Sequence, residues 1–188
     1  MEIAIAVGVI VLVLLIAIWV SYNRFVEQRQ LMRDAWANID TELQRRYDLI
    51  PNLVETVKGY ATHERVLFEE VTAARAAALG SQGTPGEQAR DEQQLVRTLQ
   101  QLFAVAEGYP TLQASGNFLA LQRELATTED RIQVARRFFN ANVRNFNRRV
   151  QAFPSNMMAW AMHLTEAEYF EVEPAVRSAG PPQVSPAI

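Results

Sequence analysis

The unbroken apolar run from Ile3 to Val20 constrains this chain more strongly than any other feature. As a helix rising ~1.5 Å per residue, these 18 residues would span about 27 Å, close to the thickness of the bilayer hydrocarbon core. A cleaved signal peptide begins with basic residues, whereas Glu2 precedes this run. We therefore expect residues 1–21 to form an uncleaved transmembrane anchor that includes Ile3, Gly8, Leu12, Trp19 and Val20.

Positive charge lies on one side of the apolar run. No Lys or Arg precedes it, whereas Arg24, Arg29 and Arg33 follow it. Basic flanks of a transmembrane helix stay in the cytoplasm, so this asymmetry predicts an outside amino terminus and a cytoplasmic segment from residue 21 to residue 188. The absence of cysteine is compatible with a reducing compartment.

Four long helical patterns follow the anchor, with breaks expected at Pro51, Pro85 and Pro110. Each pattern repeats apolar residues every three, four or seven positions, and the last has the strict spacing of a coiled coil. No alternating strand pattern occurs. We predict an all-α fold in which an antiparallel four-helix bundle of long helices follows the anchor. The four stripes are Phe25, Met32, Trp36, Ile39, Leu43 and Ile50; Leu53, Val57, Tyr60, Leu67, Phe68 and Val71; Leu95, Leu99, Leu102 and Phe103; and Phe118, Leu125, Ile132, Phe139 and Phe146.

The end of the chain differs in composition from these helices. Residues 173–188 include four prolines and show no burial pattern, which predicts a disordered Pro-rich tail. The expected organisation is therefore an anchor over 1–21, a four-helix domain over 22–172 and a tail over 173–188.

Two blocks of motifs add a family resemblance to this pattern. The first block contains Tyr22-Asn23-Arg24-Phe25-Val26, Ala35-Trp36-Ala37-Asn38-Ile39-Asp40 and the run from Arg45 to Tyr60. The second contains Tyr109-Pro110, Asn117-Phe118, Glu129-Asp130-Arg131-Ile132, Ala135-Arg136-Arg137, Phe139-Asn140 and Phe153-Pro154. In order and spacing, both blocks resemble the LemA family. The resemblance implies a bacterial single-pass protein of the plasma (inner) membrane, with a cytoplasmic helical bundle, no settled biochemical activity and a role in membrane organisation.

The residues that enzymes of this size commonly use are scarce in this chain. It has no cysteine, and His63 and His163 are not part of Glu-x-x-His or His-Glu-x-x-His motifs. No phosphate-binding loop accompanies the single lysine, Lys58. We expect no catalytic residue, no metal and no cofactor. A net charge of −3 gives no reason to expect a nucleic-acid partner.

One polar group leaves an enzyme or sensor open as an alternative. Asp40, Arg45, Arg46 and Asp48 lie just before Pro51, where a bend could gather them into a small site. The favoured interpretation is structural, with these charges solvating or bridging the corner between two helices. Asn142 is expected to set helix register through an interhelical hydrogen bond.

A basic cluster near the end of the fourth pattern suggests a second membrane contact. In an up-down-up-down bundle this end returns to the bilayer, so Arg144, Arg148 and Arg149 are expected near its anionic surface. Trp160 could lie in the interface beside them. The alternative is that Met157, Trp160 and Leu164 close the core while nearby carboxylates neutralise the arginines, and for Trp160 this alternative is favoured. Those carboxylates are Glu166, Glu168, Glu171 and Glu173.

The scarcity of catalytic residues favours a scaffold or adaptor. Ala4 and Gly8 form a small-x-x-x-small pattern, which allows transmembrane helices to approach closely, although the same face could simply meet lipid. The expected partners are the lipid bilayer, further copies of the chain and an unidentified protein.

Overall fold

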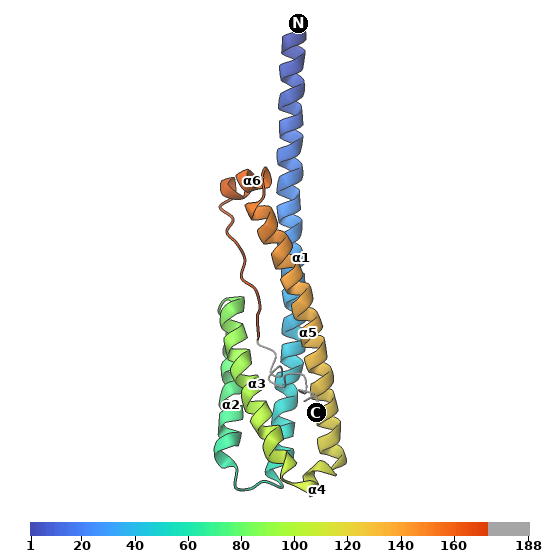
Figure 1. The fold of residues 1–188 in the computed structure, drawn as a ribbon, viewed down its shortest axis with the longest axis vertical. Coiled ribbons are helices and arrows are strands. Elements are labelled where there is room, and N and C mark those ends of the chain that lie inside the picture. The colour runs from blue at the N-terminus through green and yellow to red at the C-terminus, as the bar shows by residue number, and fades with distance from the viewer. Residues whose placement is uncertain (173–188) are drawn as a thin grey trace, which may run out of the picture. The chain divides into compact units, whose positions relative to one another are not determined.

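The computed structural model describes residues 1–172, and this part of the chain contains helices and no strand. The predicted all-α fold is therefore confirmed. The predicted disordered tail, residues 173–188, lies outside the described residues. Figure 1 shows the helices, which are α1 (Glu2–Lys58), α2 (Arg65–Gly80), α3 (Pro85–Glu107), α4 (Pro110–Gln113), α5 (Gly116–Gln151) and α6 (Ser155–Ala161).

These helices divide between two compact units, and the two longest helices contribute to both. The first unit comprises Met1–Leu43 and Thr128–Tyr169, whereas the second comprises Gln44–Thr127 together with residues 170–172. Four long helices are present, but the second predicted stripe does not lie on one helix. Leu53 and Val57 belong to α1, whereas Leu67, Phe68 and Val71 belong to α2, and Tyr60 lies in the turn between them. A single bundle over residues 22–172 stays a prediction.

In the first unit, α1 and α5 run antiparallel. The rings of Phe25 and Phe146 lie 6.0 Å apart, and those of Trp36 and Phe139 lie 5.2 Å apart. Residues farther along α1 therefore contact residues nearer the start of α5. Both edge-to-face pairs come from the predicted stripes, and edge-to-face packing of aromatic rings is favourable beyond the area it buries.

The second unit contains the end of α1, the hairpin of α2 and α3, and the start of α5. Thr84 caps α3 in a reciprocal capping box with Glu87, and Pro85 follows at a position where its missing N–H costs nothing. Asn117 on α5 donates to Thr56 Oγ1 on α1 at 3.0 Å. The core of this unit includes the buried side chains of Ile50, Leu53, Val57, Val71, Leu95, Leu102 and Leu112.

Pro51 does not end the first helix, so the predicted break and bend there are wrong. The helix α1 is 57 residues long and continues through Pro51 to Lys58. A proline inside a helix leaves the carbonyl four residues earlier without its usual donor. That carbonyl belongs to Tyr47, and Arg75 Nε on α2 donates to it at 2.7 Å. A tertiary hydrogen bond therefore replaces the bond that the proline removes.

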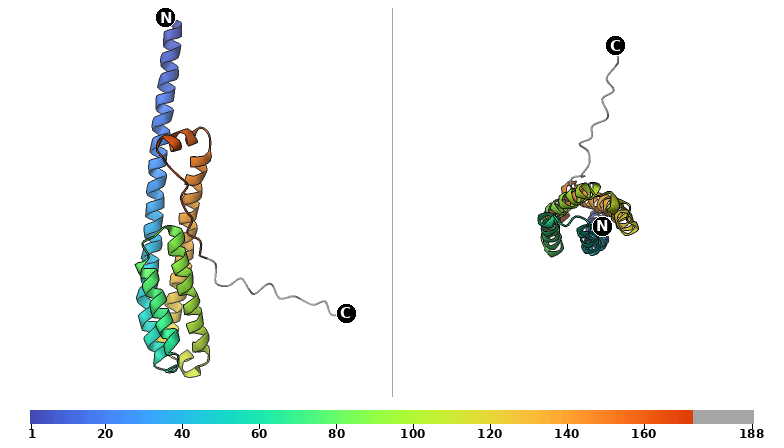
Figure 2. Two further views of the ribbon diagram at one scale, coloured as in Figure 1. Left: turned by 90° about the vertical axis from the view of Figure 1, so that its left-hand side faces the viewer. Right: turned by 90° about the horizontal axis from the view of Figure 1, so that it is seen from below.

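Among the described helices, only α1 is long and apolar enough to cross a membrane, and its apolar window lies near the amino terminus. This criterion rests on length and composition. None of the apolar window of α1 is buried by the rest of the chain. Figure 1 and the left view of Figure 2 show its first turns extending past α6 without a neighbouring element. A long apolar helix at this end is confirmed.

Candidate functional site

The short helix α6 lies beside the apolar segment of α1, and its side chains divide between two faces. Ser155 Oγ donates to the carbonyl of Arg149 at 2.7 Å, which holds the start of α6 against the end of α5. On one face, Ala159 is buried against Phe25 and Phe146. Met158, Met162 and Leu164 pack on the same cluster.

The other face of α6 is apolar and open. Trp160 is 81% exposed, Met157 is 65% exposed, and Phe153 just before the helix is 80% exposed. The favoured prediction that Trp160 closes the core is therefore wrong. Ala159 takes the core position because it is small enough to let α6 approach Phe25 and Phe146, which leaves the indole on the opposite side of the turn. An exposed Trp next to an apolar helix is typical of a membrane interface.

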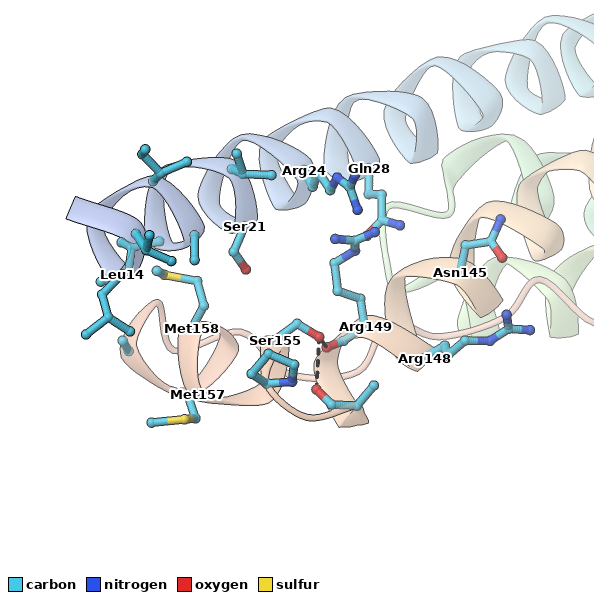
Figure 3. Close-up of a pocket in the computed structure, with 18 residues that line it drawn as sticks. Leu14, Ser21, Arg24, Gln28, Asn145, Arg148, Arg149, Ser155, Met157 and Met158 are labelled. Carbon is cyan, nitrogen blue, oxygen red and sulfur yellow. Dashed lines mark hydrogen bonds between the residues drawn. The ribbon is translucent and has the colours of Figure 1, made fainter. Parts of the chain in front are cut away.

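An open groove of about 1080 Å³ lies between α1, α5 and α6 (Figure 3). Its walls change in character along α1, from the apolar side chains of residues 13–20 to the polar ones of Ser21, Arg24 and Gln28. Met157 and Met158 line the apolar end from α6. The polar end is completed from α5 by Asn145, Arg148 and Arg149.

The arginines expected at the membrane surface do not share one environment. Arg149 turns toward α1, where Arg24 and Gln28 lie, and its guanidinium carbon is 5.9 Å from the centre of the Phe25 ring. Arg148 points away from that pair (Figure 3), and Arg144 is exposed. Within residues 1–172, no carboxylate forms an ion pair with Arg24, Arg148 or Arg149. These three guanidinium groups therefore have no direct ion-pair partner in that part of the chain.

Asn147, rather than Asn142, makes the hydrogen bonds between separate segments. Its amide donates to the carbonyl of Ala167 at 2.9 Å and its oxygen accepts from the N–H of the same residue at 2.8 Å. Asn142 donates only to Phe138 on its own helix, at 3.1 Å, so the prediction of an interhelical bond is wrong. Both asparagines flank the apolar stripe of α5. They differ because the chain after α6 returns past Asn147 and brings Ala167 within hydrogen-bond distance of it.

Of the four residues predicted to form a polar corner, one enters a buried site. Asp40, Arg45 and Asp48 are exposed, and Asp48 accepts a hydrogen bond from Gln44. Arg46 is buried and pairs with Glu92 on α3.

Glu92 is the centre of a network that sequence reasoning missed. It is fully buried and accepts hydrogen bonds from Arg46, Tyr47 and Gln88. One signal was available, since Gln88 and Glu92 continue the stripe of Leu95, Leu99 and Leu102 toward the start of α3. Gln88 Nε2 also donates to Tyr47 Oη and to the carbonyl of Ala78. No residue of this network lines the groove between α1, α5 and α6 or the smaller pocket beside Phe103 and Phe118. No group of three residues able to hold a metal ion occurs within residues 1–172 either.

Comparison with known proteins identifies a family. A sequence model of the LemA family matches residues 35–185. The chain is 28% identical over 179 residues to the magnetosome proteins MamQ 1 and MamQ 2 of Paramagnetospirillum magneticum, an alignment that covers 82% of this chain and 66% of each relative. It is 27% identical over 200 residues to magnetosome protein MamQ of Magnetospirillum gryphiswaldense, with coverage of 93% and 74%. The chain thus spans about two thirds of the length of these relatives.

Proposed function

The chain belongs to the LemA family, and from this premise we propose that it is a single-pass membrane protein that organises a membrane by binding rather than by catalysis. Residues 1–21 anchor it, and the end of α5 together with α6 makes a second contact with the same leaflet. Relatives named as magnetosome proteins support a role at a membrane.

The position and open face of α6 carry this proposal. Its exposed apolar side chains lie beside the stretch of α1 that is suited to the bilayer, so a membrane around that stretch would also meet Met157 and Trp160. Arginines without carboxylate partners lie immediately next to them. Each Arg near an anionic leaflet contributes about 1 kcal/mol to binding, and Trp prefers the interfacial region.

Fluorescence of Trp160 tests this contact in the full-length protein. The double variant Trp19→Phe/Trp36→Phe leaves Trp160 as its single indole. In vesicles with lipids brominated near the headgroup, we expect strong quenching of Trp160. A matched variant that retains only Trp36, which packs on Phe139, should be quenched little. Equal, weak quenching in both variants would contradict the contact of α6 with lipid.

The proposed topology places the amino terminus outside and the helical part in the cytoplasm of a bacterial inner membrane. Arg24, Arg29 and Arg33 support this orientation through the positive-inside rule. Protease added to intact spheroplasts should leave the helical part undigested and digest it after lysis. Digestion before lysis would reverse the orientation.

Self-association and an unidentified protein partner complete the proposed scaffold. At Gly8 a built Cβ would meet nothing within 4 Å, so this side of the anchor is free to approach another helix. Gly8→Leu should weaken energy transfer between labelled copies in vesicles, whereas Leu12→Ile, which keeps the volume, should not. Unchanged transfer in Gly8→Leu would exclude this face as the contact. In-cell crosslinking through α2 and α3 would identify partners of the helical part.

A further inference from the structure

The groove between α1, α5 and α6 has the polarity pattern of a phospholipid. Along α1 its lining is apolar from Val13 to Val20 and polar from Ser21 to Gln28, a length of about 24 Å at ~1.5 Å per residue. The apolar end lies within the segment suited to the bilayer core, and the polar end lies where headgroups would be. Contact with a flat membrane surface alone would not require a groove that runs from the apolar segment into the polar one.

Three buried polar atoms at this groove have no hydrogen-bond partner within residues 1–172. They are Ser21 Oγ, Gln28 Oε1 and Arg149 Nε. Leaving a buried donor or acceptor unsatisfied costs about 1–3 kcal/mol, so three at one place indicate a site completed by something else. Ser21 and Arg149 offer donors, and the Gln28 oxygen is an acceptor.

The positive charge at the polar end of the groove favours an anionic occupant. Arg24 and Arg149 both line it, and no described carboxylate pairs with either. Guanidinium groups bind phosphate oxygens strongly, with geometry that matches two donors to two oxygens. The Gln28 oxygen can accept from a hydroxyl of the headgroup.

We infer that this groove binds one anionic phospholipid with a hydroxyl-bearing headgroup, of the phosphatidylglycerol type. Its phosphate lies at Arg24 and Arg149, and one acyl chain lies along residues 13–20 of α1 and against Met158. The inference rests on the proposed membrane anchoring and deepens it, because it assigns a defined lipid site in addition to a general surface contact.

Native mass spectrometry of the full-length protein tests the site. Protein released from nanodiscs that contain equal amounts of phosphatidylglycerol and phosphatidylethanolamine should retain one phosphatidylglycerol in preference. Arg24→Gln/Arg149→Gln should lower that retention about tenfold or more, since two phosphate contacts are lost. The control Arg29→Gln/Arg144→Gln removes the same charge from exposed positions of the same two helices and should retain the lipid. Circular dichroism verifies that both variants are folded.

A second variant tests the shape of the site without changing its charge. Ser21→Phe places a ring in the groove and should also abolish the retained lipid, while Trp160 remains quenched by brominated lipid. Millimolar inorganic phosphate or glycerol phosphate should not displace the lipid, because neither occupies the apolar end. Displacement by either would show a phosphate site and overturn the lipid assignment.

Two further results would overturn the inference while leaving the surface contact intact. One is equal loss of retained lipid in the Arg24/Arg149 and Arg29/Arg144 variants, which indicates general electrostatic attraction. The other is equal retention of both lipids by the unmodified protein. Failure of the surface contact itself is detected separately, by the absence of Trp160 quenching.

Discussion

The two compact units treat their charged groups in opposite ways. In the second unit, the carboxylate of Glu92 is buried on the same helix as Gln88 and receives hydrogen bonds from three side chains of that unit. In the first unit, Arg24 and Arg149 line an open groove, and no described carboxylate pairs with them. A buried carboxylate that receives three hydrogen bonds belongs to the folded core of its unit. A unit that exposes cations and apolar side chains beside a hydrophobic helix is suited to contact with a membrane.

The largest effect is expected when the buried carboxylate of the second unit is removed. Glu92→Ala should lower the free energy of unfolding by about 3–5 kcal/mol, because it leaves the Arg46 charge buried without its partner. Urea titration monitored by circular dichroism measures the loss. The control Glu55→Ala removes an exposed pair with Lys58 and should cost less than about 1 kcal/mol. The paired replacement Arg46→Met/Glu92→Met should recover most of the loss, and a cost equal to that of Glu92→Ala would contradict an uncompensated charge as its cause.

A smaller effect is expected where the first unit does satisfy buried polar groups. Asn147→Ala removes both hydrogen bonds to Ala167 and should cost about 2–3 kcal/mol. Hydrogen exchange should accelerate in residues 162–169, which this side chain holds against α5. Asn142→Ala, which loses only a bond within its own helix, should change exchange there little. Equal effects of the two substitutions would argue against a role for Asn147 in holding this segment.

The bond that allows α1 to continue through Pro51 gives a third test. Arg75→Met should cost about 1–2 kcal/mol, because the Tyr47 carbonyl loses its donor. In a Pro51→Ala background the new backbone N–H can bond to that carbonyl, so the same change should cost clearly less. A double-mutant cycle by urea unfolding measures the difference, and an additive result would show that the two positions are not coupled.

The smallest effect concerns a side chain that folding does not need. Trp160→Ser should change the free energy of unfolding by less than about 0.5 kcal/mol, because the indole is 81% exposed. Trp36→Ser in the same unit removes an edge-to-face contact with Phe139 and should cost several times more. Thermal unfolding in mild detergent compares the two variants. A large loss for Trp160→Ser would assign the exposed face of α6 to the core rather than to a membrane.

The sequence by itself determined the class of the fold and the family. Apolar residues repeated at helical spacing predict long helices rather than strands, because each helix must turn one stripe toward a core. The apolar run from Ile3 to Val20 likewise predicts the exposed start of α1, since its composition allows no polar face. These properties depend on neighbours along the chain, and a sequence records them directly.

Only the tertiary structure decided which polar and aromatic residues matter. Whether Pro51 ends a helix depended on Arg75, 24 residues later, reaching the freed carbonyl of Tyr47. The same holds for Glu92, which looks like an ordinary acidic residue until α1 brings Arg46 to it. Trp160 lies outside the core because the smaller Ala159 occupies the position beside Phe25. In each case the outcome depended on a contact between segments distant in sequence, which no pattern within one helix can reveal.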